Sequence, residues 1–311
     1  MADASSIRRT RLFQVARVIL AIPIGFFLLL GVVLFLSQRK LMYHPRPYDP
    51  NYTRMIEGRV SEISFQTADG TQRAFYISPR GAENGAPPER LWVFFHGNAG
   101  QALDWIDEPF VFRNHDKGAG MLLVDLPGYG ASEGSPTRAG IIANGEGAFL
   151  ELARLHKLDP DDLARRTGVV GYSMGAAAGL ELATRHPMRA AIIISPFTSI
   201  TDMAGQLYGP FKHIALDRFD NRARLDELAA RDPAPTVWIF HGAKDDLIPV
   251  AMAEELAARQ PAITRLHIVE QLDHNWILSA IAGDVQAAML EAFGVEGEPP
   301  PASRPSGDSA P

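Results

Sequence analysis

Residues 167–185 read TGVVGYSMGAAAGLELATR and join a strand pattern, a glycine-flanked serine and a helix pattern without a break. The short β-branched run Thr167–Tyr172 is typical of a buried strand, and the alanine-rich stretch from Met174 to His186 is typical of a helix packed closely on a sheet. Ser173 lies between them in the pattern Gly-x-Ser-x-Gly. The two glycines are needed because a Cβ in so tight a turn would collide with the adjoining strand or helix. The stretch therefore predicts a nucleophile elbow.

The same alternation of strand and helix patterns extends from about residue 60 to residue 294. It predicts the α/β class, with a mostly parallel sheet of about eight strands and helices on both faces. SEISFQT and RAFYISP flank the turn residues Ala68-Asp69-Gly70, so we expect the sheet to begin with an antiparallel hairpin. The later strand patterns are LWVFF, MLLVDL, TGVVGY, AAIIIS, PTVWIF and TRLHIVE. Functional side chains are expected where such strands end.

A second serine, Ser132, matches the same pattern in Gly130-Ala131-Ser132-Glu133-Gly134. The residues Pro127–Gly130 separate it from the strand MLLVDL, and Ser135-Pro136-Thr137 follows it instead of an apolar helical run. Glycine, proline and serine at this density indicate a loop. Ser173 is therefore the predicted nucleophile, and Ser132 is expected in a loop at the rim of the site.

A serine hydroxyl is inert until a base takes its proton and an acid orients that base. In a sheet of this kind the chain order is serine, acid and histidine. Of the nine histidines, His267 and His274 alone lie beyond the plausible acids. His267 lies inside the strand pattern LHIVE and is interpreted as structural. His274 follows that strand in the loop QLDHNW, so we predict that it is the base.

The predicted acid is Asp245, which follows the strand TVWIF in HGAKDDLIP. Its neighbour Asp246 ranks second, and Asp202, which follows an earlier strand, ranks third. Attack on a carbonyl also needs N–H donors for the negatively charged oxygen. The amides of Met174, at the start of the helix, and of Asn98, in the loop HGNAG, are the predicted oxyanion-hole donors.

His96 and His241 each begin a His-Gly turn after a strand, and no second ligand stands at zinc spacing from either. Both are interpreted as structural. The chain has no cysteine, which excludes disulfides, a thiol nucleophile, iron–sulfur clusters and cysteine-based zinc sites. The proposed chemistry needs no cofactor and no metal.

The formal net charge of −6 is divided unevenly, because residues 1–50 are basic and the remainder is acidic. An acidic body of this size repels phosphate backbones, so nucleic acid is not an expected partner.

The basic end flanks the run Val18–Leu36, VILAIPIGFFLLLGVVLFL, which is nineteen residues without a charge. This is about the length that a helix needs to cross the hydrocarbon core of a bilayer. A cleaved signal peptide is the competing interpretation, but Leu36-Ser37-Gln38-Arg39 is a poor cleavage site. A third interpretation of this run is a buried helix of a soluble protein. Arginine and lysine stand on both sides of the run, and we expect the main body to face outward, in the periplasm or another extracytoplasmic space.

The expected organisation follows from these boundaries. A short basic N-terminus (1–17) precedes the transmembrane anchor (18–36) and a linker (37–59), and the catalytic domain spans residues 60–294. A tail rich in Pro, Gly and Ser (295–311) is expected to be disordered.

With these residues in place, the chain resembles the α/β-hydrolase superfamily across roughly residues 60–294. More narrowly, it resembles the membrane-anchored α/β-hydrolase-domain proteins, which are depalmitoylase-like or serine aminopeptidase-like. The motifs that carry the resemblance are HGNAG (96–100), GYGASEGSP (128–136), GYSMG (171–175), SPFTSI (195–200) and RFDN (218–221).

The resemblance implies a serine hydrolase that acts on esters or thioesters, with a small-molecule or lipid-like acyl substrate. Some eukaryotic relatives remove palmitate from proteins, and others are described as peptidases or lipases. A peptidase of the same fold and a catalytically silent, membrane-tethered scaffold are the alternatives. This superfamily inserts lids in the segment from Pro196 to Pro235, which is short here and is expected to form a modest cap containing Tyr208, Phe211 and Phe219.

Overall fold

The computed structural model describes residues 4–108, 111 and 116–296. Its centre is one eight-stranded sheet in the order β1-β2-β4-β3-β5-β6-β7-β8. The first two strands form the expected hairpin, β2 pairs antiparallel with β4, and every later pair is parallel. The strand bounds are β1 Ser61–Thr67, β2 Gly70–Ile77, β3 Arg90–Phe95, β4 Ala119–Val124, β5 Thr167–Tyr172, β6 Ala190–Ile194, β7 Thr236–Gly242 and β8 Thr264–Val269. The predicted fold class is confirmed.

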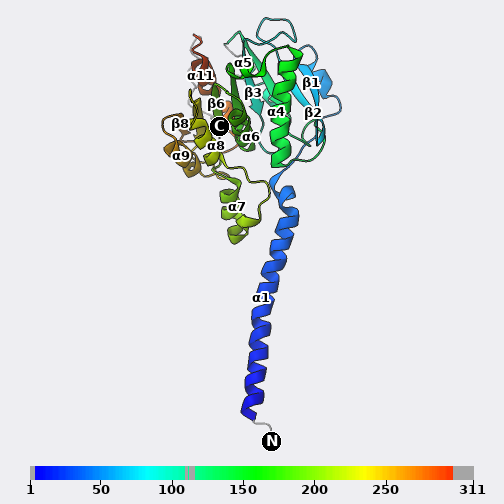
Figure 1. Cartoon of the computed structure of the whole chain (residues 1–311), viewed down its shortest axis with the longest axis vertical. Coiled ribbons are helices and arrows are strands. Elements are labelled where there is room, and N and C mark those ends of the chain that lie inside the picture. The colour runs from blue at the N-terminus through cyan, green and yellow to red at the C-terminus, as the bar shows by residue number, and fades with distance from the viewer. Residues whose placement is uncertain (1–3, 109–110, 112–115, 297–311) are drawn as a thin grey trace, which may run out of the picture.

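Helices cover both faces of the sheet (Figure 1). One face packs against α4 (Arg138–Leu155), α5 (Pro160–Ala164), α6 (Met174–Arg185), α8 (Asn221–Ala229) and α9 (Val250–Arg259). The other packs against α2 (Tyr52–Ile56), η1 (Ala102–Trp105), α10 (Ile277–Ala280) and α11 (Ala282–Phe293). Because both faces are covered, the central strands read as continuous apolar runs.

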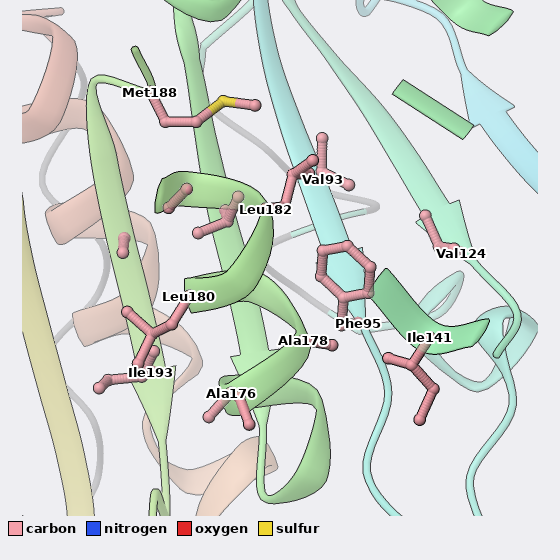
Figure 2. Close-up of a cluster of buried hydrophobic side chains, with 14 of the residues drawn as sticks. Val93, Phe95, Val124, Ile141, Ala176, Ala178, Leu180, Leu182, Met188 and Ile193 are labelled. Atoms are coloured by element: carbon pink, nitrogen blue, oxygen red, sulfur yellow. The ribbon is translucent and has the colours of Figure 1, made fainter. Parts of the chain in front are cut away.

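Helix α6 lies on the middle of the sheet, against β3, β5 and β6, and Figure 2 shows Ala176, Ala178 and Leu180 of this helix in one buried cluster with Phe95 of β3. All four side chains are buried. The small alanines let the helix axis approach the strands closely, and the leucines fill the remaining space. This packing fixes the N-terminus of α6 at the carboxyl end of β5, where Ser173 lies.

The N-terminal helix α1 (Ala4–Met42) projects from the body as one long rod (Figure 1). Leu20–Met42 is apolar enough to cross a membrane, with a mean hydropathy of 2.6 and none of its most apolar window buried. The helix continues past the run that ends at Leu36, because Ser, Gln, Arg and Lys are compatible with a helix and basic residues suit its C-terminal end. The segment expected as a linker therefore begins with helix, and nonhelical chain starts at Tyr43.

Two elements after β6 form a small cap beside the end of α1. Helix α7 (Ile200–Tyr208) is capped by the Ser199 hydroxyl, which accepts from the Asp202 N–H, and it leads into the short 3₁₀ helix η2 (Gly209–Ile214). Figure 1 shows α7 extending from the body alongside α1. Phe219 is buried in the core, so only part of the segment 196–235 forms the cap. All but the first two residues of the expected tail lie outside the described residues.

Candidate active site

Ser173 stands in a strained turn between β5 and α6. Its backbone has φ 54° and ψ −115°, a conformation that costs a residue with a side chain about 1 to 3 kcal/mol and that clusters at functional sites. A Cβ on Gly171 would meet the backbone of Gly175, and one on Gly175 would meet the carbonyl of Phe95. No side chain fits at either position, because the backbone of a neighbouring segment lies too close. The tight turn predicted from the sequence requires both glycines for this same steric reason.

His274 and Asp245 form a direct, buried pair. The Nδ1 atom of His274 lies 2.7 Å from Oδ2 of Asp245, and both residues are buried. Asp245 follows β7, and His274 lies in the loop after β8, so adjacent parallel strands deliver them to the same edge of the sheet. Because the carboxylate accepts, the proton of the ring is on Nδ1, and Nε2 is left as the basic nitrogen.

The carboxyl group of Asp245 is kept ionised by its surroundings. Burial by itself raises its pKa, but hydrogen bonds from His241, His274 and the N–H of Ile248 outweigh burial and hold the pKa well below the usual value. Its Oδ1 accepts the N–H groups of Leu247 at 3.0 Å and Ile248 at 2.7 Å. The acid is thus charged and fixed in position before any substrate binds.

His241, interpreted from the sequence as structural, touches the acid directly. Its Nε2 lies 3.3 Å from Oδ2 of Asp245 and 2.8 Å from the carbonyl of Ile248. Both neighbours are acceptors, so Nε2 carries the proton. The spacing of four residues between His241 at the end of β7 and Asp245 just after it is the sequence signal that would have found this contact.

Tyr172 links the histidine loop to the elbow. Its hydroxyl donates to the carbonyl of His274 at 2.7 Å, and the two rings are 5.1 Å apart. Tyr172 immediately precedes Ser173, so this bond holds the main chain of the predicted base against the residue next to the predicted nucleophile. The structure therefore joins Asp245 to His274 and His274 to the elbow.

The competing residues have other partners. The carboxylate of Asp202 bonds Thr198 at 2.8 Å and Ser199 at 2.6 Å and also pairs with Arg222, whereas Asp246 is exposed. The ring of His267 stacks on Phe240 at 4.8 Å.

The hydroxyl of Ser132 is engaged in holding its loop. It accepts from the backbone N–H of Arg73 at 2.9 Å and lies 3.4 Å from the carbonyl of Asp125. These contacts tie the loop to β2 and to the end of β4.

The two predicted oxyanion donors belong to neighbouring segments, because Met174 directly follows Ser173 and Asn98 follows Gly97, where an added Cβ would meet the ring of Tyr172. Among the residues that the structure describes, neither the backbone N–H of Asn98 nor that of Met174 has a hydrogen-bond acceptor. Met174 opens α6, whose N-terminal partial charge is positive and favours a negative oxygen. These two groups are thus free to bind an anion.

The side chain of Asn98 has a role that the sequence did not indicate. Its Oδ1 accepts from the N–H of His44 at 2.9 Å and from the hydroxyl of Tyr129 at 2.7 Å. Its Nδ2 donates to the carbonyl of Met42 at 2.8 Å. The loop HGNAG is therefore fastened to the chain that leaves α1.

The segment after α1 is bonded along the site rather than hanging free. The carbonyl of Arg46 accepts from the N–H of Gly130 at 2.9 Å and from the side chain of Gln101 at 2.8 Å. The hydroxyl of Tyr48 donates to Asp125 at 2.8 Å. The loop GYGASEGSP thus holds the segment that follows α1 in place through hydrogen bonds. The prolines and tyrosines of YHPRPYDP, which are unusual for a flexible linker, were the available signal.

His96 has the structural role that the sequence predicted. It is fully buried, its Nδ1 lies 2.8 Å from the carbonyl of Gly97, and its Nε2 accepts from the N–H of Leu126. Burial lowers its pKa to about 4, so the ring is neutral. Within the described part of the chain, no group of three or more His, Asp or Glu residues is arranged to hold a metal ion.

The sequence of this chain is similar to those of known α/β-hydrolase proteins and of uncharacterized proteins. A family model described as the alpha/beta hydrolase family matches residues 92–230. The uncharacterized protein Rv2307c of Mycobacterium tuberculosis is 28% identical over 251 residues, which are 79% of this chain and 84% of the relative. The alpha/beta hydrolase domain-containing protein WAV2 of Arabidopsis thaliana is 28% identical over 265 residues, 77% of this chain and 82% of the relative.

Solved structures agree in fold. The esterase Pf2001 of Pyrococcus furiosus superposes with a TM-score of 0.59 at 15% identity, covering 81% of this chain and 97% of the esterase. An alpha-beta hydrolase of Vibrio vulnificus gives a TM-score of 0.61 at 16% identity, covering 85% and 92%. Together with the sheet order, these likenesses show an α/β-hydrolase fold, and the alpha/beta hydrolase family model matches residues 92–230 within it.

Proposed function

We propose that this protein is a membrane-anchored serine hydrolase that cleaves carboxylic ester or thioester bonds through an acyl-enzyme intermediate. The observation that carries the proposal is the buried pair of His274 and Asp245, bonded through Tyr172 to the end of the strand that immediately precedes the strained Ser173. An ionised acid, an oriented imidazole and a serine at a nucleophile elbow are the three groups that acyl transfer requires.

The first chemical step forms the acyl-enzyme. The Oγ of Ser173 attacks the substrate carbonyl while Nε2 of His274 takes its proton. Asp245 stabilises the imidazolium that results, and the N–H groups of Asn98 and Met174 bind the oxyanion. His274 then gives the proton to the leaving alcohol or thiol, and the carbon–oxygen or carbon–sulfur bond breaks.

The second step uses the same residues. Water gives a proton to His274 and attacks the acyl carbonyl, and the two N–H groups again donate hydrogen bonds to the oxyanion. The proton then returns from His274 to Oγ of Ser173 as the carboxylic acid leaves.

Membrane anchoring by α1 is part of the proposal. The apolar part of α1 is long enough to span a bilayer. Beyond it, Arg39 pairs with Asp217 at 3.1 Å, and the carbonyl of Met42 accepts from Asn98, so the end of the helix is integrated with the body. Cleavage near Leu36 would leave these contacts in place but would remove the stack of Phe27 on Phe211, whose ring centroids are 4.4 Å apart, and this stack favours an uncleaved anchor over a signal peptide. The body is proposed to face outward.

Covalent labelling tests the mechanism. A fluorophosphonate probe reacts with an activated serine, so we expect labelling of the wild type and of Ser132→Ala, and none of Ser173→Ala. The circular dichroism spectrum of each variant controls for folding. Absence of labelling in the folded wild type would contradict the proposal and leave the silent scaffold. A panel of acyl esters, thioesters and aminopeptidase substrates then distinguishes an esterase from a peptidase.

A further inference from the structure

An apolar groove of about 130 Å³ lies between the last turns of α1 and the cap. Its walls include Leu34, Leu41 and Met42 from α1 and Met203, Leu207 and Phe211 from the cap. An apolar cavity of roughly 150 Å³ stays dry and takes up a hydrocarbon ring. The groove is therefore large enough for part of a hydrocarbon chain.

The two walls are fastened to each other by polar bonds at the groove's margin. Gln38 accepts the N–H of Leu216 at 2.7 Å through Oε1, and its Nε2 donates to the carbonyl of Phe35 at 2.8 Å. Asp217 binds Arg39 at 3.1 Å through Oδ2 and accepts the N–H of Arg138 at 2.9 Å through Oδ1. These polar groups are already engaged, so apart from Tyr208 the remaining lining of the groove is mostly apolar.

The inner end of the groove borders the proposed oxyanion hole. Met42 lines the groove, and its carbonyl accepts from Nδ2 of Asn98 at 2.8 Å. The groove thus ends beside Asn98, whose N–H is one of the two groups proposed to bind the oxyanion.

The outer end lies against the apolar part of α1. Phe211 stacks on Phe27 with ring centroids 4.4 Å apart, and the absence of a side chain at Gly31 leaves room for this ring. Phe27 precedes Leu36 by nine residues, or about 14 Å along a helix axis. If α1 spans the bilayer, the cap dips into the lipid here, which accounts for the exposure of Leu207 and Leu216.

We propose that this groove binds one acyl chain of a membrane lipid ester, which enters sideways from the bilayer and brings its carbonyl to Ser173. The inference rests on the proposed function and specifies its substrate class. Three observations indicate an acyl chain as the occupant of the groove. The lining is apolar, the outer end of the groove lies beside the proposed membrane span, and its inner end lies beside the loop that contains Asn98. Helix α1 is then a wall of the substrate site as well as an anchor.

A groove-filling variant tests the proposal in the full chain reconstituted in phosphatidylcholine nanodiscs. Ala204 lines the groove, whereas Gln206 of the same helix is exposed and does not. Ala204→Phe is compared with the matched control Gln206→Phe, and kcat/KM is measured for p-nitrophenyl palmitate and p-nitrophenyl butyrate. We expect the palmitate-to-butyrate ratio to fall at least about tenfold in Ala204→Phe, because several methylenes lose their contacts. The ratio should stay constant in Gln206→Phe. An unchanged ratio in Ala204→Phe would overturn the proposal.

Photocrosslinking gives a readout that does not depend on catalysis or on the activity of the groove variant. Phosphatidylcholine with a diazirine near the end of one acyl chain is added to nanodiscs that contain full-length Ser173→Ala. We expect cross-links in α7, in η2 and in residues 34–42, weakened when Ala204→Phe is added and kept with Gln206→Phe. Cross-links that avoid both walls would refute the groove. If the wild type neither labels nor hydrolyses either ester, the proposed function fails, while the crosslinking result still reports on the groove.

Discussion

Replacing Asn98 by alanine is expected to weaken the candidate site even though the proposed donor, its backbone N–H, is retained. The substitution removes the bonds to Met42, His44 and Tyr129, which are 2.8, 2.9 and 2.7 Å long. A hydrogen bond of this kind contributes about 0.5 to 1.5 kcal/mol, so the three together correspond to about 1.5 to 4.5 kcal/mol. This free energy holds the oxyanion loop against the segment after α1.

The expected effect on activity is intermediate. Complete loss of one oxyanion donor costs about 10² to 10³ in rate, and a loosened donor should cost about 10 to 10². We would measure kcat/KM for p-nitrophenyl butyrate, together with the thermal unfolding midpoint in detergent. His44→Ala is the matched control, because it removes only a ring contact to Asn98 and keeps the backbone N–H. Activity of Asn98→Ala within twofold of the wild type would refute the reasoning.

Four further variants test the remaining geometry. Asp245→Asn should lower kcat by about 10³ to 10⁴ with an unchanged circular dichroism spectrum, because the amide favours the wrong imidazole tautomer; a smaller loss would argue for another acid. Tyr172→Phe should lower kcat/KM by about fivefold through one lost hydrogen bond to the His274 loop, and no change would show that the bond does not position the base. Gly175→Ala should destabilise the fold by about 3 kcal/mol or more in denaturant unfolding, because its Cβ would meet the Phe95 carbonyl; wild-type stability would contradict the tight turn. Burial raises the pKa of Asp125 to about 7 from 3.8. Its stabilising contribution is therefore complete below about pH 4 and is lost as the pH rises through about 7. Asp125→Asn should remove this trend from melting curves between pH 4 and 8, and parallel curves for both proteins would refute it.

The sequence by itself determined the sheet, the elbow and the order of the candidate residues. These features are written in local patterns, such as apolar runs of strand length and the glycines on either side of Ser173. Their physical causes act within a few residues, since periodicity decides which side of an element is buried, and a missing Cβ decides which turn is possible. The pairing of Asp245 with His274 followed from strand order, because parallel strands bring their carboxyl ends to one edge.

Only the tertiary structure decided how α1 joins the site. Asn98 meets Met42 across 56 residues of chain, and Gln38 meets Leu216 across 178 residues. No local pattern encodes such contacts, because Asn98 and Gln38 are ordinary polar residues until the fold brings a backbone group of a distant segment to each of them. The groove between α1 and the cap arises in the same way, from two apolar surfaces that meet only because the fold places the elements between them.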